Sequence, residues 1–210
     1  MAIKAAIHEL ADKYAQELES KTSVRVIEMA KDDKSHYLIY HVLGISDTEG
    51  EMIDVYQNKG RFLYKYAGDF LEEAAVLCFK EKFPQAKKAN VVNTLGHRPK
   101  QFEIDCLIDN DAIEIKWRDA TTDGDHITKE HTRIQAIKAH GYKPIRVMFY
   151  YPNRAQATRV QATLKTVYAG VGGEYYAGDE AWNYVLQRTK IDLKSLLVEI
   201  AEANQSRRTR

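Results

Sequence analysis

The sequence predicts an α/β protein in which a mixed sheet is flanked by helices, and three observations support this class. From residue 68 onward, helix-like and strand-like segments follow one another in the order helix, strands, helix, strand, helix. Residues 102–119 read as two short strands joined by an Asp-Asn-Asp turn at 109–111. The apolar run at 143–151 follows directly on a helix pattern, which is typical of a buried strand.

The first part of the chain is expected to combine one helix with several strands. An amphipathic pattern that includes acidic residues predicts a helix ending near Ser20. The segments that follow are rich in β-branched and aromatic residues, which favour strands. Strands are therefore predicted at 23–30, 36–44, 52–57 and 61–66, the last two joined by a hairpin turn at 58–60.

The remaining elements follow from helix periodicity and from residues that stop helices. Helices are expected at 68–83, 128–140, 154–168, 179–188 and 192–205, and a short strand at 90–95. Pro84 and Gly141 end two of these helices, and Asn153 is expected to cap the start of a third. The glycine-rich segment 169–179 is interpreted as a flexible loop, and the basic residues 206–210 as a frayed tail.

The composition is that of an ordinary globular protein. Of the 210 residues, 44% are hydrophobic and 29% are charged, and no apolar run approaches the ~20 residues that span a bilayer. The N-terminal segment lacks the apolar stretch of a signal peptide. Cys78 and Cys106 lie within apolar runs, which favours reduced core thiols over a disulfide or a metal pair. We therefore expect a cytoplasmic protein.

The net charge of +1 hides an uneven distribution of charge. Residues 1–73 hold 9 Lys and Arg against 14 Asp and Glu, whereas residues 74–170 hold 16 against 10. The positive excess therefore surrounds the hairpin at 102–119, where it suits a polyanionic partner. A charged surface that contacts only water explains the same counts.

Three charged residues stand out within the predicted hairpin. Glu114 and Lys116 share one face of its second strand, while Ile113 and Ile115 take the other face. If the two strands pair about their turn, Asp105 joins the same charged patch. Two close carboxylates repel each other unless a cation compensates, and carboxylate oxygens suit Mg²⁺. A lysine beside such a cation suits phosphodiester hydrolysis, although the same charges also fit a solvated strand face.

These residues resemble a known nuclease motif. Ile104-Asp105, followed after eight residues by Glu114-Ile115-Lys116, is similar to the PD-(D/E)xK motif, with Ile104 in place of the usual proline. The longer segments RPKQFEIDCL, AIEIKWRDATTDGDHITKEHTR, YKPIRVMFYYPNR and GVGGEYY resemble the ApaLI-like type II restriction endonucleases over roughly residues 68–200. The resemblance implies a four-stranded mixed sheet flanked by helices, with Mg²⁺ at its edge.

The resemblance also implies a set of roles. Three groups would bind Mg²⁺: Asp105, Glu114 and the carbonyl of Ile115. Lys116 would orient or activate the attacking water. Many members of the nuclease superfamily add a Glu four residues after a Gly in the preceding helix, and Gly68 and Glu72 fit that spacing. Glu72 also lies on the apolar stripe of its helix, although an acid near a helix N-terminus is equally explained by the helix dipole.

Basic residues that follow Lys116 are expected to contact DNA phosphates and base edges. They are Arg118, His126, Lys129, His131 and Arg133. Ordinary surface charge is the alternative for each of them. A zinc site at His126 and His131 is disfavoured, because paired helical ligands need a spacing of four and these are five apart.

The predicted function is that of a Mg²⁺-dependent type II restriction endonuclease of a prokaryotic cell. It would cut duplex DNA at a short palindrome and would act as a homodimer because both strands are cut. The resemblance implies a six-base palindrome such as GTGCAC as the first target to test. A single nuclease domain over 1–210 is expected, with its catalytic core at 68–170, an N-terminal addition at 1–67 for dimerisation or recognition, and terminal helices in 171–210. The alternatives are a structure-specific repair or junction-resolving nuclease and a non-catalytic DNA-binding module.

Overall fold

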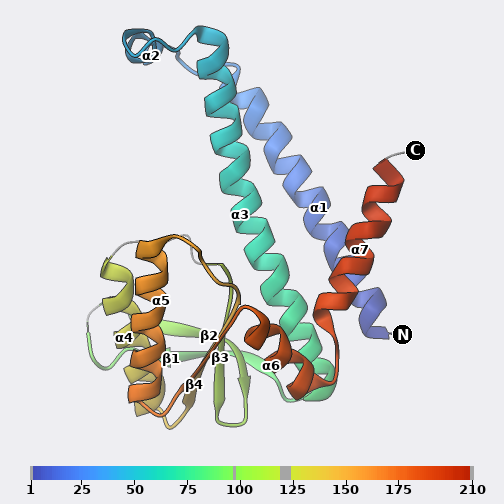
Figure 1. Ribbon diagram of the computed structural model, residues 1–210, viewed down its shortest axis with the longest axis vertical. Helices are drawn as coiled ribbons and strands as arrows, with labels where there is room; N and C mark the ends of the chain where they lie inside the picture. The colour runs from blue at the N-terminus through green and yellow to red at the C-terminus, as the bar shows by residue number, and fades with distance from the viewer. Residues whose placement is uncertain (1, 97, 119–123, 209–210) are drawn as a thin grey trace. The chain divides into compact units, whose positions relative to one another are not determined.

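A computed structural model of the chain describes residues 2–96, 98–118 and 124–208 (Figure 1). In this part of the chain, seven helices and one open five-stranded mixed sheet confirm the predicted α/β class. The chain divides into two compact units. One is His8–Phe70, and the other combines Met1–Ile7 with Leu71–Arg210. None of the described helices is both long and apolar enough to cross a membrane.

The unit His8–Phe70, called the helical unit below, consists of helices and the turns between them. Its elements are α1 (Ala2–Met29) from His8 onward, α2 (Tyr37–Val42) and the first part of α3 (Asp47–Lys82). The strands predicted at 23–30, 36–44, 52–57 and 61–66 are therefore wrong. The predicted helix end near Ser20 and the turn at 58–60 are also wrong, because α1 continues to Met29 and α3 passes through residues 58–60.

The cause of this error is visible in the spacing of the apolar residues of α3. Met52, Tyr56 and Leu63 are separated by four and seven residues, which are multiples of a helical turn. Such a period places them on one helix face, whereas strands need alternation. The β propensity of individual Val, Ile and Tyr residues is a weaker signal than this period, and the segment is helical.

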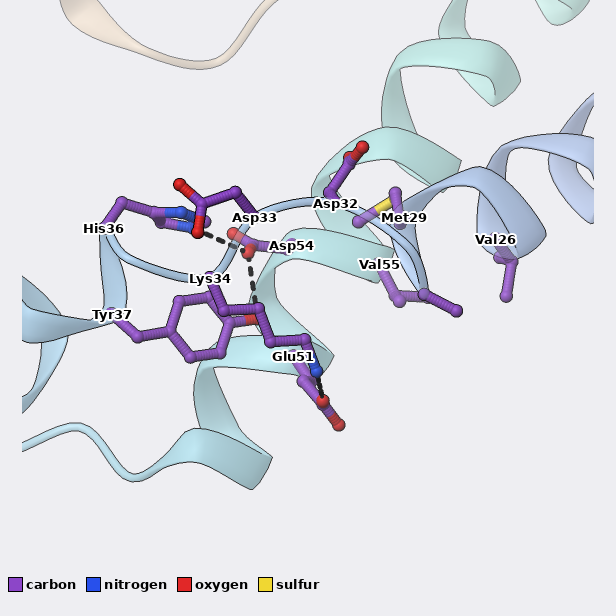
Figure 2. Close-up of a pocket in the computed structure, with 11 residues that line it drawn as sticks. Val26, Met29, Asp32, Asp33, Lys34, His36, Tyr37, Glu51, Asp54 and Val55 are labelled. Carbon is purple, nitrogen blue, oxygen red and sulfur yellow. Dashed lines mark hydrogen bonds and ion pairs between the residues drawn. The ribbon is translucent and has the colours of Figure 1, made fainter.

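Aromatic rings and one acidic side chain hold the helical unit together. The Tyr14 ring of α1 meets the rings of Tyr66 and Phe70 of α3 edge-on, with centroids 6.1 and 6.0 Å apart. Near α2, the Asp54 carboxylate accepts hydrogen bonds from the hydroxyls of Tyr37 (3.2 Å) and Tyr40 (2.9 Å). Figure 2 shows Tyr37 and Asp54 beside a pocket of about 290 Å³. One carboxylate of α3 therefore anchors α2.

The second unit, called the sheet unit below, contains strands in the order β1-β2-β3-β4-β5. The first three strands pair antiparallel: β1 (Lys87–Val92), β2 (Gln101–Ile108) and β3 (Asp111–Arg118). The other two pair parallel to β3 and to each other: β4 (Lys143–Tyr150) and β5 (Glu174–Ala177). The hairpin, the buried strand at 143–151 and the mixed sheet are thus confirmed.

The fifth strand corrects two predictions at once. A sheet of four strands was expected, and β5 lies inside the segment 169–179 that was interpreted as a loop. The strand has only four residues between glycines, which is too short to show a period. Its pairing with β4 supplies the backbone hydrogen bonds, so tertiary structure rather than local sequence defines it.

Helices cover the sheet. On one face, Ile134 of α4 (Gly124–Ala139) packs against Leu164 of α5 (Ala155–Gly170), and the two helices lie side by side in Figure 1. The remaining elements are α6 (Asp179–Thr189) and α7 (Leu193–Arg208). Asn153 does not cap α5 as predicted, because the helix begins one residue later and its N-cap is Arg154. The frayed tail is also wrong as far as Arg208, since α7 reaches that residue.

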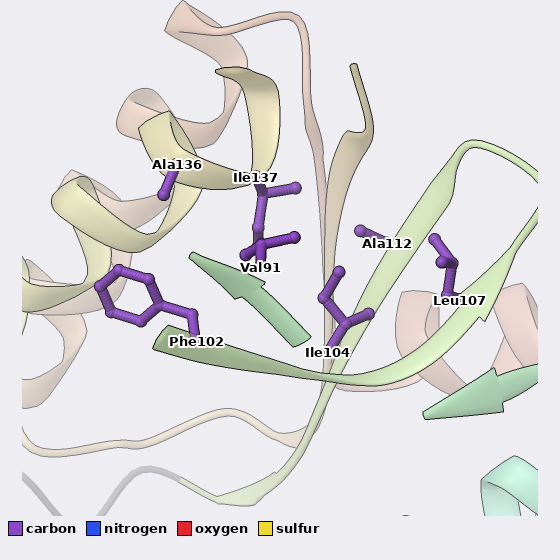
Figure 3. Packing of buried hydrophobic residues seen from close by; sticks show 7 residues of the cluster. All are labelled: Val91, Phe102, Ile104, Leu107, Ala112, Ala136 and Ile137. Atoms are coloured by element: carbon purple, nitrogen blue, oxygen red, sulfur yellow. The ribbon is translucent and has the colours of Figure 1, made fainter. Parts of the chain in front are cut away.

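Buried apolar residues join the antiparallel strands to α4. Figure 3 shows one such cluster, formed by Val91, Phe102, Ile104, Leu107 and Ala112 of the strands and by Ala136 and Ile137 of α4. Cys78 and Cys106 are free and fully buried, which confirms the predicted core thiols. Burial raises the pKa of both thiols to about 12, so neither is reactive at neutral pH.

Candidate active site

The hairpin of β2 and β3 places Asp105 beside the backbone of β3. The paired register of the two strands runs from Ile108 opposite Asp111 to Cys106 opposite Ile113. At the next residue, Oδ2 of Asp105 accepts a hydrogen bond of 2.7 Å from the backbone N–H of Ile115. Asp105 is 4% exposed. A hydrogen bond thus holds the buried Asp105 carboxyl group against β3, the strand that carries Glu114 and Lys116.

Asp105 belongs to a cluster of three carboxylates. Oxygens of Asp105, of Glu103 two residues earlier, and of Glu72 on α3 all lie within 4.8 Å of one another. Glu103 was not among the predicted site residues, although strand alternation puts it on the same face as Asp105. Three oxygen donors at this spacing fit a hard divalent cation. Glu114 is not a member of this cluster.

A lysine that the sequence did not single out faces the cluster. Nζ of Lys88 on β1 lies 2.7 Å from a carboxylate oxygen of Glu72 and 3.5 Å from one of Glu103. The pairing of β1 with β2 shifts here, from Lys87 opposite Leu107 to Ala89 opposite Ile104. The hydrogen bond to Glu72 raises the pKa of Lys88, although burial opposes this. Lys88 therefore balances part of the negative charge of the cluster.

Glu114 of β3 is buried among positive charges instead. Its carboxylate forms ion pairs with the ammonium of Lys116 and with the guanidinium of Arg133 on α4. Arg133 also donates a hydrogen bond to the backbone carbonyl of Glu103. Burial alone would raise the pKa of Glu114, but the charges of Lys116 and Arg133 lower it below its ordinary value. Glu114 is therefore ionised at neutral pH.

A second buried ion pair lies behind Glu114. Arg146 of β4 is opposite Glu114 in the parallel register of β3 with β4 and is 1% exposed. Its Nη1 lies 3.1 Å from Oε1 of Glu130 on α4, and the same oxygen accepts a 2.5 Å hydrogen bond from the hydroxyl of Tyr168 on α5. Charged and polar groups therefore link β4, next to the strand of Glu114, to the helices α4 and α5.

The protonation of Asp105 is the most perturbed feature of the cluster. Burial, followed by the nearby charge of Glu114, raises its pKa from 3.8 to about 8, with a further contribution from Glu72. Lys116 and the N–H of Ile115 oppose this shift without cancelling it. Without a cation, Asp105 therefore keeps its proton at neutral pH. A cation bound by the carboxylates would favour the ionised form, which is the behaviour of a metal ligand.

Lys116 remains charged although its side chain is partly buried. Burial alone would lower its pKa, but the charges of Glu114 and Asp105 raise it above the ordinary value. The ammonium can therefore donate hydrogen bonds and stabilise negative charge at neutral pH. In this state it has no free electron pair with which to remove a proton from water.

The residues predicted to contact DNA do not gather in one place. Lys129 and His131 are exposed on α4, whereas Arg133 points inward to Glu114. His126 lies in α4, but its side chain lies outside the described residues. Arg118 lies at the end of β3, with its guanidinium carbon 5.7 Å from the ring centroid of Trp117.

Arg118 lines a pocket at the ends of the parallel strands β3 and β4. The pocket has a volume of about 560 Å³, and the residues around it include Trp117, Tyr150, Tyr151 and Arg154. Aromatic faces and guanidinium groups are the side chains that stack on bases and bind phosphates. Arg154 and the two tyrosines were not predicted as site residues, because they lie at or just after the end of β4 and not beside the nuclease motif.

A mixed sheet flanked by helices, with acidic residues and a lysine on its central hairpin, defines the restriction-endonuclease-like class of proteins. The sequence profile of the ApaLI-like restriction endonucleases matches residues 1–202, and the chain belongs to this family. Membership supports a type II restriction endonuclease in general terms, and it implies binding to DNA. The match also includes the helical unit, which the resemblance from residue 68 onward did not cover. No curated protein and no solved structure matches the chain.

Proposed function

We propose that the protein is a Mg²⁺-dependent endonuclease that hydrolyses both strands of duplex DNA at a short palindromic site, as a homodimer. The proposal rests mainly on one observation. The hairpin of β2 and β3 carries both Asp105 of the carboxylate cluster and the ion pair of Glu114 with Lys116. A buried carboxylate that is protonated without a cation, beside a lysine that stays charged, suits hydrolysis of a phosphodiester rather than simple binding of an anion.

The proposed roles divide between the two groups of charges. Asp105 would hold Mg²⁺ together with Glu72 or Glu103, and with Glu114 and the Ile115 carbonyl as the resemblance implies. When bound, the metal supplies positive charge for the phosphoryl oxygens and lowers the pKa of a bound water. Lys116 donates a hydrogen bond that orients the attacking water and stabilises developing negative charge. Arg133 keeps the Glu114 carboxylate in position from the helix side.

The activity itself has a direct test. We expect purified protein to cut a long duplex DNA of known sequence in the presence of Mg²⁺ and to leave it intact in EDTA. Mapped ends should fall at one short palindrome, and GTGCAC is the first site to compare. Preferential cutting of four-way junctions would favour the structure-specific alternative. Salt-dependent binding without any cutting would favour the DNA-binding module.

The pocket at the ends of β3 and β4 is the proposed contact with the DNA backbone. Arg118→Ala and Arg154→Ala should each flatten the slope of log affinity against log salt by about 0.9 for every phosphate that the missing guanidinium had neutralised. The measurement is a salt titration of binding to duplex DNA in Ca²⁺. The same change at exposed Lys165 on α5 is the control. Unchanged slopes for both arginine variants would exclude this pocket from the interface with phosphates.

A further inference from the structure

Large apolar side chains are unusually exposed in the helical unit. Among the described residues, 16 large hydrophobic side chains are about half exposed or more, and 11 of them lie within His8–Phe70. This unit is less than a third of the chain, so the exposure is concentrated there. Exposed apolar residues that occur singly need no explanation, but a contiguous patch marks an interaction site.

On α3, four exposed large apolar residues and two half-buried small residues lie along one stripe. Successive residues of an α-helix are ~100° apart, so the six residues of this stripe fall within an arc of about 100°. They are Met52, Ile53, Tyr56, Gly60, Leu63 and Ala67. Between Met52 and Ala67 no charged residue enters this arc. The large members are between 46% and 67% exposed. We call this surface the α3 stripe.

The α3 stripe is distinct from the face that α3 presents to α1. Tyr66, which meets the ring of Tyr14, is 9% exposed. Asn58 accepts a 3.3 Å hydrogen bond from Arg25 of α1. Both Asn58 and Tyr66 project about 90° or more from the centre of the stripe. The contact with α1 therefore leaves the stripe open.

Gly60 lies at the centre of the α3 stripe and has no role within the described chain. A glycine inside a helix is unfavourable relative to alanine, so its presence needs a reason. A Cβ atom at Gly60 would meet no other atom within 4 Å, and packing inside the chain therefore does not require glycine. A missing side chain at the middle of an apolar stripe allows the backbone of another helix to approach closely.

The neighbouring helix α2 has exposed apolar side chains of its own. Its anchoring tyrosines point to Asp54, and four other large apolar side chains at α2 and its C-terminal end are 59% to 73% exposed. They are Leu38, Ile39, Val42 and Leu43. Together with the four large side chains of the α3 stripe, they account for eight of the 11 large apolar side chains that the helical unit exposes.

The symmetric spacing of the stripe points to a second copy of the chain as the partner, and the charge of the unit argues against DNA. The helical unit holds 8 Lys and Arg against 12 Asp and Glu, a net charge of −4, which repels DNA. Around Gly60 the spacing is symmetric. Ile53 and Ala67 lie seven residues to either side, and Tyr56 and Tyr64 lie four, although Tyr64 projects about 20° beyond the edge of the stripe. An antiparallel two-fold contact at Gly60 therefore sets tyrosine opposite tyrosine and a large side chain opposite a small one.

We propose that the α3 stripe is the dimerisation surface, and that two copies of α3 cross antiparallel at Gly60. The proposed function gives this dimer its purpose, because cutting both strands needs two active sites. The association itself does not depend on cleavage. A failure of the proposed chemistry therefore leaves the following measurements unaffected.

The first experiment measures the mass of the full-length protein in solution by sedimentation. The unaltered protein should be a dimer, and Tyr56→Glu and Leu63→Glu should each weaken self-association on the order of 100-fold while circular dichroism stays unchanged. Arg61→Glu is the matched control, because it is exposed on the same helix but lies outside the stripe. A monomeric unaltered protein, an intact dimer in both stripe variants, or an equal loss in the control would overturn the proposal.

A second experiment tests the crossing point and does not depend on the folding of the charged variants. At a two-fold axis the same residue of both copies meets, so Gly60→Cys should form a disulfide-linked dimer on mild oxidation. Arg61→Cys, one residue away and pointing off the stripe, should remain uncrosslinked. The native cysteines are buried and do not compete. Equal crosslinking of both variants, or none of Gly60→Cys, would overturn the antiparallel crossing.

Discussion

Asp105→Asn should abolish Mg²⁺-dependent cleavage and, at the same time, stabilise the metal-free protein at pH 8. The loss of activity follows from removing the buried carboxylate of the cluster, whose charge the metal requires. The gain in stability follows from the pKa of about 8 in the folded protein, against 3.8 for an ordinary Asp. The variant should thus lose activity but gain stability. Replacing an acid with a purely structural role should lower stability instead.

The sign of the stability effect depends on proton uptake. Between pH 4 and pH 8, Asp105 is ionised in the unfolded chain but protonated in the folded protein, so its contribution to the free energy of unfolding falls as pH rises. Asparagine does not titrate, and its amide oxygen can still accept the N–H of Ile115. The advantage of the variant should therefore grow from near zero at pH 4 to on the order of a few kcal/mol at pH 8.

Urea unfolding in EDTA at pH 5 and pH 8, combined with single-turnover cleavage in Mg²⁺, measures both effects. Asp109→Asn is the matched control, since it makes the same change at an exposed turn of the same hairpin, where φ is 52° and Asn is well tolerated. A variant that cuts at the normal rate would remove Asp105 from the site. A stability difference that does not grow with pH would contradict the raised pKa.

Lys116→Ala should lower the single-turnover rate of cleavage by ~10²–10⁴-fold, the usual contribution of a positioned proton-handling or charged group. The affinity for DNA should change by only about one charge contact. Glu114 and Asp105 raise the pKa of Lys116, so the ammonium acts as a donor and a positive charge rather than as a base. Lys116→Arg should accordingly keep more of the rate than Lys116→Ala.

Binding in Ca²⁺ and cutting in Mg²⁺ on the same variant distinguish these effects. Lys80→Ala, an exposed position on α3, is the control for the loss of one positive charge. A rate that is unaltered while the fold is intact would show that Lys116 is not part of the mechanism. A large loss of affinity at a normal rate would instead assign it to DNA binding.

The sequence predicted the hairpin and its charges because both depend on local rules. Alternation along a strand and a turn of three polar residues place Asp105, Glu114 and Lys116 on one hairpin. Lys88 and the inward direction of Arg133 could not be predicted, since their partners Glu72 and Glu114 lie 16 and 19 residues away. Those contacts come from packing of α3 and α4 against the sheet.

The helical unit was mispredicted for a different physical reason. Many of its apolar residues are not matched by a core inside the described chain, so a pattern of buried and exposed residues could not guide the choice of period. Val24 and Ile27, for example, lie in α1 and are 51% and 60% exposed. Where apolar residues face outward, β propensity and helical spacing conflict, and only the spacing agrees with the structure.

The buried pair of Arg146 and Glu130 has a consequence for how the parallel strands find their alignment. Nearly every residue of β4 is buried, so the apolar pattern alone does not distinguish one register from the next. A slip by one residue would turn Arg146 to the other face of the sheet and separate it from Glu130, at a cost of ~3–5 kcal/mol for an unpaired buried charge. Parallel strands joined through a helix pair slowly, because a long loop must close before their contacts form. In a misaligned sheet, Glu114 would no longer lie opposite Arg146 on β4. We therefore expect the buried charge of Arg146 to destabilise misaligned sheets while the strands pair.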